Sequence, residues 1–403
     1  MDKCFIDNSM LSVEQALDFL LKCVKIKAEL EDINIKDSLN RVLAKDIKSK
    51  INIPPCDNSA MDGYAINVDD DYKNNELLIT QRITAGSVGD NLLKGSAARI
   101  FTGAFIPKGA NAVVMQEECD NLRDKVRINA EVKKGQNIRR QAEDVKIADT
   151  VLKKGQIITA QDMGLIASLG LSEIKVYRKI SVAIFTTGNE ICEPGDDIKL
   201  GQIYNSNRYV LIGLLKSMGV ELIDLGLVKD DFATTKKTLI AASKKADVII
   251  STGGVSVGEE DYVKKALEEV GELNLWKVKM KPGKPLAFGK INNTFFLGLP
   301  GNPVSAFVVF NLFVRYFLNK LSGAASELKT YKVRAGFNWH KKAFRREYVR
   351  VKIINNEAIL YKNQSSGVLT STTWADGLVC IYENTVIQKG DLVDFINFSQ
   401  WRC

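Results

Sequence analysis

Several short motifs in this sequence combine glycine or proline with charged side chains, as anion-binding loops do. Three of them are glycine-rich segments that follow apolar runs, at residues 186–190, 251–261 and 298–305. Glycine lets the backbone approach a ligand closely, and the first turn of a helix offers free N–H groups to an anion. Because the three segments occur in one region and two carry a carboxylate, they favour a phosphate or nucleotide site over ordinary turns.

A fourth motif, Lys-Pro-Gly-Lys-Pro at residues 281–285, places two lysines in a backbone that its prolines stiffen. Fixed cations at this spacing suit a doubly charged oxyanion or a phosphate. A charged surface turn is the simpler alternative, but such a turn would not need so rigid a backbone. The motif therefore predicts that Lys281 and Lys284 bind an anion.

Carboxylates lie in or beside these motifs, and two more occur in an earlier motif at residues 57–64. Oxygen ligands without histidine or cysteine suit Mg²⁺ bound beside phosphates. A single aspartate of this kind is more typical of a turn or a helix cap. Taken together the set favours a magnesium site, and its members are Asp57, Asp62, Glu190, Asp230, Asp231 and Asp261.

The composition excludes several other kinds of chemistry. The chain has one histidine, His340, so it cannot form an HExxH zinc site, and a Ser-His-Asp triad is not expected. Neither the P-loop pattern GxxxxGK[ST] nor the dinucleotide fingerprint GxGxxG occurs. The seven cysteines form no CxxC pair, which is typical of reduced thiols in the cytoplasm.

The charge pattern gives little support to a macromolecular partner. The net charge is +8, and basic residues gather at 341–346 without the interleaved aromatic residues of single-strand binders. A solvated surface is the simpler interpretation of this cluster. The N-terminus lacks a signal-peptide pattern, and the apolar runs are too short and interrupted to span a bilayer. We therefore expect no nucleic-acid or membrane partner.

Alternating strands and helices must position the glycine-rich motifs. Strands are predicted at residues 182–185, 220–225, 248–250 and 275–278, and helices at 206–218, 234–245, 262–270 and 303–321. This succession indicates a doubly wound parallel sheet. Ligands bind such sheets at the carboxyl ends of the strands, which is where the glycine-rich motifs occur.

The remaining segments are more irregular. A capping box at residues 12–15 begins a helix with an apolar face, followed by a charged stretch to residue 46 that is helical or mixed. Short strands separated by Gly- and Asn-rich turns predict a small β-rich domain from residue 56 to about 144. A helix is expected at 160–169, and a second β-rich domain after residue 323 contains runs at 331–335, 348–354, 358–361 and 392–395.

The motif at residues 57–65, Asp-Asn-Ser-Ala-Met-Asp-Gly-Tyr-Ala, resembles the signature of molybdopterin molybdenumtransferases, a family that includes the E-domain of gephyrin. Further segments resemble the family in the same order over nearly the whole chain. These segments are residues 101–104, 113–117, 137–140, 253–258, 281–285 and 299–305.

The resemblance implies four domains. They are a discontinuous linker domain (1–50 and 145–178), an inserted β-rich domain (51–144), a doubly wound, adenylyltransferase-like α/β domain (179–325) and a C-terminal β-barrel-like domain (326–403). It also implies an elongated homodimer whose active site joins the α/β and C-terminal domains of one subunit to the inserted domain of the other.

The function that the resemblance implies is insertion of molybdate into adenylylated molybdopterin, with Mg²⁺-dependent release of AMP. Expected catalytic residues are Asp62, Thr102, Asp261, Lys281 and Lys284. Expected substrate-binding residues are Gly253, Gly254, Ser256, Gly258, Pro300, Gly301, Asn302, Pro303, Ser305, Arg350 and Ser366. Expected Mg²⁺ ligands are Glu190, Asp230 and Asp261.

Three alternatives remain beside this function. One is molybdopterin adenylyltransferase, which resembles only residues 180–325 and is itself the expected upstream partner. Another is a non-enzymatic scaffold of the gephyrin type. The third is insertion of tungstate, since tungstate and molybdate are tetrahedral dianions of nearly equal size.

Two positions depart from the family's pattern. Asn189 stands where the family usually has Asp, so a metal role is carried over only to Glu190. Ala142 stands where the family has Gly, and alanine disfavours a positive φ. A local difference is therefore expected in the loop that contains Ala142.

Overall fold

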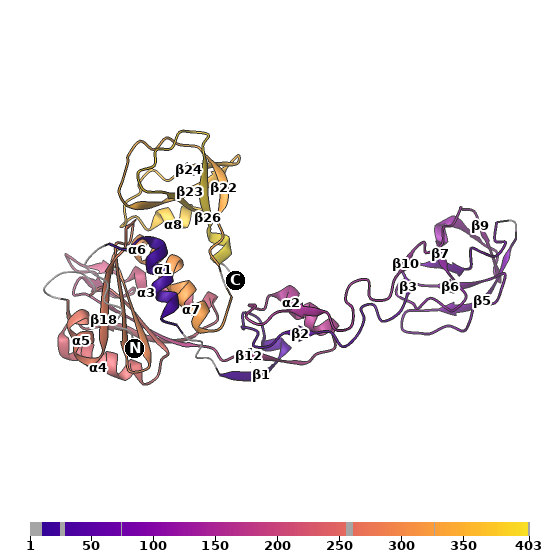
Figure 1. Ribbon diagram of the computed structural model, residues 1–403, viewed down its shortest axis with the longest axis horizontal. Coiled ribbons are helices and arrows are strands. Elements are labelled where there is room, and N and C mark those ends of the chain that lie inside the picture. Colours follow the sequence, from indigo (N-terminus) through magenta and orange to yellow (C-terminus); the bar gives the residue numbers. More distant parts are fainter. Residues whose placement is uncertain (1–9, 25–28, 74, 255–260, 326, 402–403) are drawn as a thin grey trace. The chain divides into compact units, whose positions relative to one another are not determined.

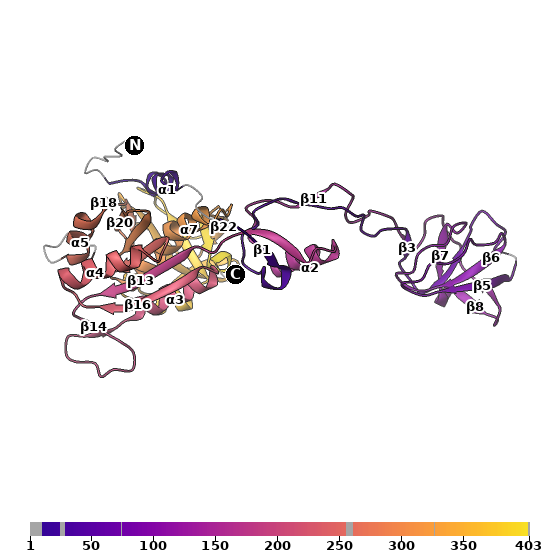
Figure 2. The ribbon, with the colours of Figure 1, turned by 90° about the horizontal axis from the view of Figure 1, so that it is seen from below.

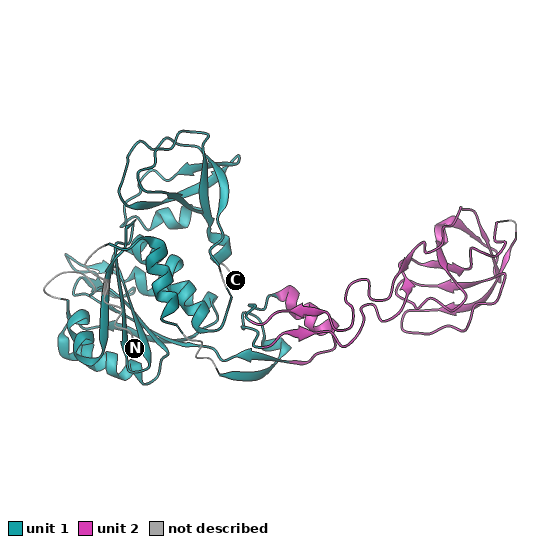
Figure 3. Ribbon diagram, in the orientation of Figure 1, with its two compact units in different colours: residues 1–44, 155–159, 174–403 teal, residues 45–154, 160–173 magenta. Residues whose placement is uncertain are grey.

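The computed structural model describes residues 10–24, 29–73, 75–254, 261–325 and 327–401. The chain divides into two compact units, shown in teal and magenta in Figure 3. Unit 1 comprises residues 1–44, 155–159 and 174–403, and unit 2 comprises residues 45–154 and 160–173. Unit 2 is therefore inserted into the sequence of unit 1.

The centre of unit 1 is a six-stranded sheet, of which β13, β16, β18 and β20 are labelled in Figure 2. In spatial order its strands are β16 (Glu221–Val228), β13 (Ser181–Thr187), β17 (Val248–Thr252), β21 (Thr294–Leu299), β20 (Pro285–Ile291) and β18 (Glu272–Lys277). The first four strands are parallel, which confirms the predicted doubly wound fold. The sheet is not parallel beyond β21. There β20 and β21 form an antiparallel hairpin that turns at Asn292, whose φ is +53°.

Helices cover both faces of this sheet because its strands alternate their side chains. Val182 and Ile184 of β13 pack in the same apolar cluster as α1 (Val13–Lys22) and α3 (Ser206–Ser217). Ala183 and Phe185 belong to the opposite cluster, with α4 (Phe232–Ser243) and α5 (Tyr262–Val270). The predicted capping box of α1 is confirmed: Ser12 and Gln15 exchange hydrogen bonds of 2.9 and 3.1 Å.

A helical segment of 19 residues, Pro303–Leu321, fills the core beside α1 and α3. It consists of α6 (Pro303–Val309), a π-helical turn η3 (Phe310–Val314) and α7 (Arg315–Leu321). Its length and composition would allow it to cross a membrane, but 83% of its 18-residue apolar window is buried inside the protein. This degree of burial is typical of a helix that forms part of a protein core.

The C-terminal part of unit 1 is a closed β-barrel, drawn in yellow at the top of Figure 1. Its strands run in the order β23, β24, β22, β26 and β25, and a β23–β25 pairing closes the ring. Their bounds are β22 (Tyr331–Ala335), β23 (Arg346–Ile354), β24 (Glu357–Leu360), β25 (Gly377–Ile381) and β26 (Leu392–Asn397), with α8 (Thr370–Trp374) and η4 (Phe398–Trp401) beside them. One further strand, β19 (Met280–Lys281), pairs in parallel with β23.

Shorter elements complete unit 1. After α1 the charged segment forms the strand β1 (Leu30–Asn34) and the turn η1 (Ile35–Asp37). β1 pairs with β12 (Glu173–Tyr177), and β14 (Ile191–Cys192) pairs with β15 (Ile203–Tyr204). The expected helical or mixed stretch after α1 therefore contains a strand and one 3₁₀ turn among its described residues.

Unit 2 contains the predicted small β-rich fold. Its six-stranded sheet has the order β7, β4, β6, β5, β9, β8. The strands of unit 2 are β2 (Ile47–Lys48), β3 (Asn58–Ser59), β4 (Gly63–Ile66), β5 (Leu77–Ile83), β6 (Ser96–Ile100), β7 (Ala112–Met115), β8 (Cys119–Asn121), β9 (Lys125–Ile128), β10 (Ile138–Arg139) and β11 (Thr150–Leu152), with η2 (Gln116–Glu118) and α2 (Ala160–Ser168). Ala142 has φ +59°, so the backbone keeps the conformation that a glycine would favour.

Candidate functional site

The glycine-rich loops of unit 1 meet at a topological switch point of the sheet. From β13 the chain passes to β16 on one side, then returns to β17 on the other side. The strand ends are aligned, since Thr187 pairs with Val228, and Thr252 pairs with Thr186 and Leu299. Ligands of doubly wound sheets bind at such a crevice, beyond the carboxyl ends of the strands.

Gly253 and Gly254 allow the loop after β17 to lie directly against the end of β13. Both have positive φ, +84° and +64°. A Cβ on Gly253 would lie 2.6 Å from the carbonyl oxygen of Thr187, and one on Gly254 would lie 2.5 Å from Cγ2 of Val263. Side chains would therefore push the two loops apart.

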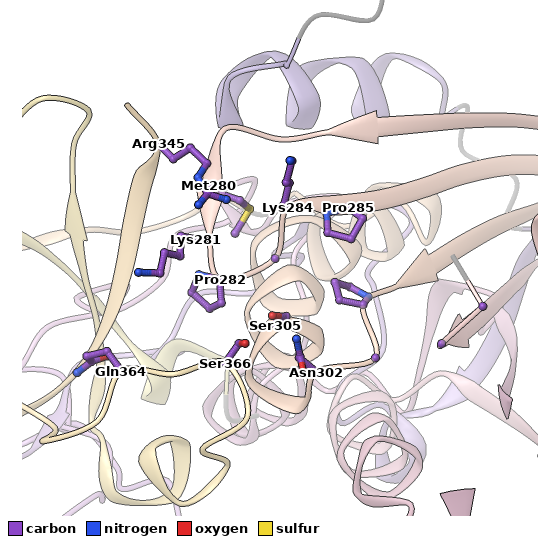
Figure 4. Close-up of a pocket in the computed structure, with 15 residues that line it drawn as sticks. Met280, Lys281, Pro282, Lys284, Pro285, Asn302, Ser305, Arg345, Gln364 and Ser366 are labelled. Atoms are coloured by element: carbon purple, nitrogen blue, oxygen red, sulfur yellow. The ribbon is translucent and has the colours of Figure 1, made fainter. Parts of the chain in front are cut away.

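The glycine loops line a cavity of about 510 Å³ that lies between the α/β sheet and the C-terminal barrel (Figure 4). The barrel contributes Arg345, Gln364 and Ser366 to its wall. Residues predicted from the sequence that line it are Gly253, Gly254, Lys281, Lys284, Pro300, Gly301, Asn302, Ser305 and Ser366. The structure thus brings the glycine and lysine motifs together.

The lysine loop, residues 281–285, contacts the barrel on one side and α6 on the other. β19 pairs Lys281 with Glu347 of β23, and the cavity-facing Gly283, with φ +102°, packs on α6. A Cβ at Gly283 would lie 2.4 Å from Cγ2 of Val309, so the loop lies closer to the helix than a larger residue would permit. The backbone rigidity predicted from the two prolines therefore has a second source in this packing.

The two lysine side chains differ in their surroundings. The ammonium of Lys281 lies 3.7 Å from Oε2 of Glu347, whose side chain is only 6% exposed. Lys284 is exposed and points in a different direction in Figure 4. The charge of Lys281 is thus partly balanced by a buried carboxylate that sequence reasoning missed, whereas Lys284 has no ion pair among the described residues.

A second cavity, of about 340 Å³, lies on the other side of the Gly301–Asn302 turn. It shares Gly253, Gly301 and Asn302 with the first cavity, and Glu190, Asn207 and Pro303 belong to its lining. The side-chain amide of Asn207 donates a 2.7 Å hydrogen bond to the carbonyl of Gly301, which fixes this turn. The turn that begins α6 therefore has one cavity on each side.

The three predicted Mg²⁺ ligands lie at different places near the carboxyl ends of the parallel strands. Glu190 lines the second cavity. Asp230 accepts a 2.8 Å hydrogen bond from Oγ1 of Thr187, and Oδ1 of Asp261 caps α5 by accepting one of 3.0 Å from the Lys264 backbone. Within the described ranges no three His, Cys, Asp or Glu side chains gather as a metal-binding group, so the three-ligand site stays a prediction.

Arg350 lies behind the first cavity instead of in its wall. It is 1% exposed, and its Nε and Nη2 donate to Oγ of Ser371 (3.0 Å) and the carbonyl of Ser365 (3.1 Å). Burial lowers the pKa of its guanidinium to about 10. Gln364, which sequence reasoning missed, accepts from the backbone N–H of Arg350 (2.9 Å) and donates to its carbonyl (2.9 Å).

These contacts position Ser366. Its carbonyl accepts a 3.0 Å hydrogen bond from the backbone N–H of Val304 in the first turn of α6. Arg350 therefore supports the segment that brings Ser366 to the cavity. The signal for Gln364 in the sequence was its place two residues before Ser366, an expected substrate-binding residue.

In unit 2, Asp62 and Thr102 form a defined pair. Oδ1 of Asp62 accepts hydrogen bonds of 2.8 Å from both the backbone N–H and Oγ1 of Thr102. The backbone hydrogen bond is the larger cause that lowers the pKa of the Asp62 carboxyl, and the hydroxyl adds to it. Asp57, in the same motif, accepts from Arg140 at 2.7 Å and from the backbone of Gln141 at 2.8 Å.

Two predicted substrate-binding residues, Ser256 and Gly258, lie outside the described residues.

Arg345 is a cavity residue that the sequence did not single out, although it belongs to the basic 341–346 cluster whose role was left open. The signal for it was the cluster itself, next to the predicted strand at 348–354.

Comparison with known proteins identifies the family. Profiles of the MoeA N-terminal region (domains I and II), a probable molybdopterin-binding domain and the MoeA C-terminal region (domain IV) match residues 11–170, 183–320 and 332–398. A molybdopterin molybdenumtransferase of Haemophilus influenzae is 45% identical over 316 residues, which is 78% of each chain. The chain belongs to the MoeA family.

Other relatives cover more of the chain. A putative molybdopterin biosynthesis protein of Methanocaldococcus jannaschii is 38% identical and spans 91% of this chain and 92% of its own. The crystal structure of a Pyrococcus horikoshii MoeA protein matches with a TM-score of 0.82 and 32% identity, over 96% of this chain and 100% of that one. The multidomain α/β fold with its closed C-terminal barrel is therefore the MoeA fold.

Proposed function

We propose that this protein inserts molybdenum from molybdate into adenylylated molybdopterin and releases AMP. The observation that carries the proposal is the cavity at the switch point, which joins the glycine loops, the lysine loop and the barrel segment of Ser366 in a member of the MoeA family. The Haemophilus influenzae relative is named for the same transfer. The related step in which molybdopterin is adenylylated would supply the substrate, so an adenylyltransferase is the expected upstream partner.

The cavity residues suit the binding of a substrate that carries phosphates beside an oxyanion. Gly253, Gly254 and the turn at Gly301 leave the backbone accessible for the phosphates and the pterin. Lys281 and Lys284 supply positive charge for molybdate. No protein nucleophile is needed, which is compatible with a chain that holds one histidine.

Magnesium fits the donor set at the strand ends. Mg²⁺ is usually held by one or two carboxylates together with substrate phosphates and water. Glu190 and Asp230, on loops that follow β13 and β16, and Asp261, at the start of α5, are the carboxylates that would hold it. Bound there, Mg²⁺ would offset the negative charge of the phosphoanhydride.

We further propose that the active protein is a homodimer in which the Asp62–Thr102 pair acts at the site of the other subunit. The family resemblance motivates this assignment. Within its own unit the pair is exposed and its carboxylate is kept ionised by Thr102, so it is available to a substrate.

The deciding experiment is incubation of the purified protein with adenylylated molybdopterin and Mg²⁺, with molybdate, tungstate or neither, while AMP is measured. Oxyanion-dependent AMP release is expected, and the two oxyanion arms establish which metal is preferred. Turnover of ATP with free molybdopterin, together with no oxyanion-dependent AMP release, would instead indicate an adenylyltransferase.

A further inference from the structure

Arg345 is a third cation in the wall of the lysine-lined cavity. It lies in the segment that enters β23, and its side chain lies beside Met280 in Figure 4. The cavity is thus lined by positive groups from two parts of the chain, Lys281 and Lys284 from the α/β domain and Arg345 from the barrel. Among the residues that the structure describes, none that lines it is acidic.

The β19–β23 pairing fixes the place of Arg345. The backbone N–H of Arg346 donates a 2.9 Å hydrogen bond to the carbonyl of Lys279, and Met280 is the register partner of Arg346. Because successive side chains of an extended segment point to opposite sides, Arg345 and Arg346 point apart. Arg346 turns away from the cavity and forms ion pairs with Glu14 and Glu383.

The charge of Arg345 is not balanced in the described part of the chain. Lys281 has Glu347 at 3.7 Å, and Arg346 has two carboxylates. Over the described residues Arg345 forms no ion pair, and its guanidinium carbon lies 5.8 Å from the centroid of the Phe344 ring. A partly buried guanidinium attracts an anion when the described residues around its cavity include other cations and no carboxylate.

We propose that Arg345 is an oxyanion-binding residue of this cavity, which contacts a tetrahedral dianion through its guanidinium. The dianion is either molybdate or a phosphate group of the adenylylated substrate. Two parallel N–H donors match two oxygens of such an anion, which a lysine ammonium cannot reproduce. The proposal rests on the proposed function and adds a residue that the sequence motifs did not include.

Equilibrium binding to the full-length protein tests the proposal, with inorganic molybdate and AMP as separate probes. Arg345→Ala should weaken binding of one of the two probes about tenfold or more, since hydrogen bonds to charged groups are strong. Arg345→Lys should remain weaker than wild type because the planar fork is lost. The probe that is affected identifies the source of the dianion.

Lys342→Ala is the matched control, because it removes the same charge from the same basic cluster at an exposed position that does not line the cavity. It should bind both probes as wild type does. Circular dichroism and thermal unfolding establish that Arg345→Ala is folded, and Arg345→Gln offers a second variant of similar size.

Unchanged affinity of Arg345→Ala for both probes would overturn the proposal, even if wild type shows molybdate-dependent AMP release. An equal loss in Lys342→Ala would also overturn it, because the effect would then be one of overall charge. Absence of oxyanion-dependent AMP release by wild type would instead count against the proposed function, whatever the binding results.

Discussion

Lys284 extends from a loop that is fixed by its neighbours, so its ammonium group starts from a defined point at the cavity. Lys281 stands at the other end of the same short segment, with Glu347 close to it. The two lysines are therefore not equivalent, and Lys284 offers the freer charge to an incoming oxyanion. This inequality could not be predicted from the motif, because Glu347 is 66 positions away in the chain (347 − 281 = 66).

Lys284→Ala should lower molybdate-dependent AMP release about tenfold or more, which corresponds to roughly 1.5–3 kcal/mol for a hydrogen bond to a charged group. The rate is measured as a function of molybdate concentration. Lys277→Ala, an exposed lysine in β18 that does not line the cavity, is the control. An unchanged dependence on molybdate in Lys284→Ala would exclude this role.

Asp261 can be tested as a metal ligand separately from its role as a cap. Asn is as good an N-cap as Asp, so Asp261→Asn should keep the stability of α5 within about 0.5 kcal/mol. An amide oxygen is a poorer Mg²⁺ ligand, so the Mg²⁺ concentration for half-maximal AMP release should rise about tenfold. Asp261→Ala should show both effects, with a loss of about 1 kcal/mol in unfolding free energy.

A normal magnesium response in Asp261→Asn would leave this residue with the structural role alone. The sequence could predict that Asp261 precedes a helix and that it lies near the glycine motif. It could not separate the two roles, because a capping aspartate and a metal-binding aspartate occur in the same kind of loop. Arg350 is a similar case: the family resemblance implied that it binds substrate, but its burial behind Ser366 depends on contacts with Ser371 and Ser365.

At the scale of elements, the close packing of the lysine loop on α6 leads to a direct prediction. Gly283→Ala should destabilise the protein by roughly 1–3 kcal/mol, because a Cβ would clash with Val309 and the residue has a positive φ. Gly301→Ala is the control, since nothing lies within 4 Å of its Cβ position. Chemical denaturation measures both, and equal stabilities of the two variants would contradict the packing argument.

Asp247 lies directly before β17, and its side chain is hydrogen-bonded to Ser181, the first residue of β13. Its carboxylate accepts hydrogen bonds from Arg178 at 3.1 Å and from the backbone N–H of Ser181 at 2.9 Å. Burial would raise the pKa of this carboxyl, but the hydrogen bonds from Arg178 and Ser181 outweigh it, so the pKa is lowered. Asp247→Asn should therefore lose roughly 1.5–3 kcal/mol at neutral pH.

The pH dependence of this loss has a definite sign. A carboxyl with a lowered folded-state pKa contributes stability above its unfolded value, and the contribution disappears as the pH falls through the folded value. The stability difference between wild type and Asp247→Asn should thus be constant near neutrality and shrink below about pH 4. A difference that grew with acidification would refute the assignment, and Asp18→Asn, at an exposed ion pair, should stay within about 0.5 kcal/mol.

Elements with strong local signals could be predicted from the sequence, and those defined by distant pairing could not. The capping box of α1 and the Asn205 cap of α3 have their signals within four residues. The hairpin of β20 and β21 was missed, although Asn292 and Asn293 between two apolar runs are a turn signal. β19 is two residues long and exists only because β23 lies beside it, so no local pattern could predict it.

For the whole molecule, the proposed shared site can be tested by mixing two inactive variants, Asp62→Ala and Lys284→Ala. In a C2 dimer each variant alone carries two damaged sites. If the partner subunit's Asp62 completes each site, a mixed dimer collects both lesions in one site and leaves the other intact. Heterodimers should then regain about half of the wild-type activity, since one site of two is whole.

Subunit exchange must be demonstrated in the same sample, for example with two differently tagged variants that co-purify. Exchange without any return of activity would mean that Asp62 acts with its own chain's lysine loop, or that it has no part in the reaction.

The pairing of β19 with β23 also limits how this protein can be divided. A fragment that ends before the barrel would keep every glycine motif and both lysines, yet Met280 and Lys281 would lose the strand that holds them, and Glu347 would be missing from beside Lys281. Such a fragment should fold as an α/β domain but hold its lysine loop in several conformations. The barrel is thus an inseparable part of the anion site and could not be exchanged as an independent module.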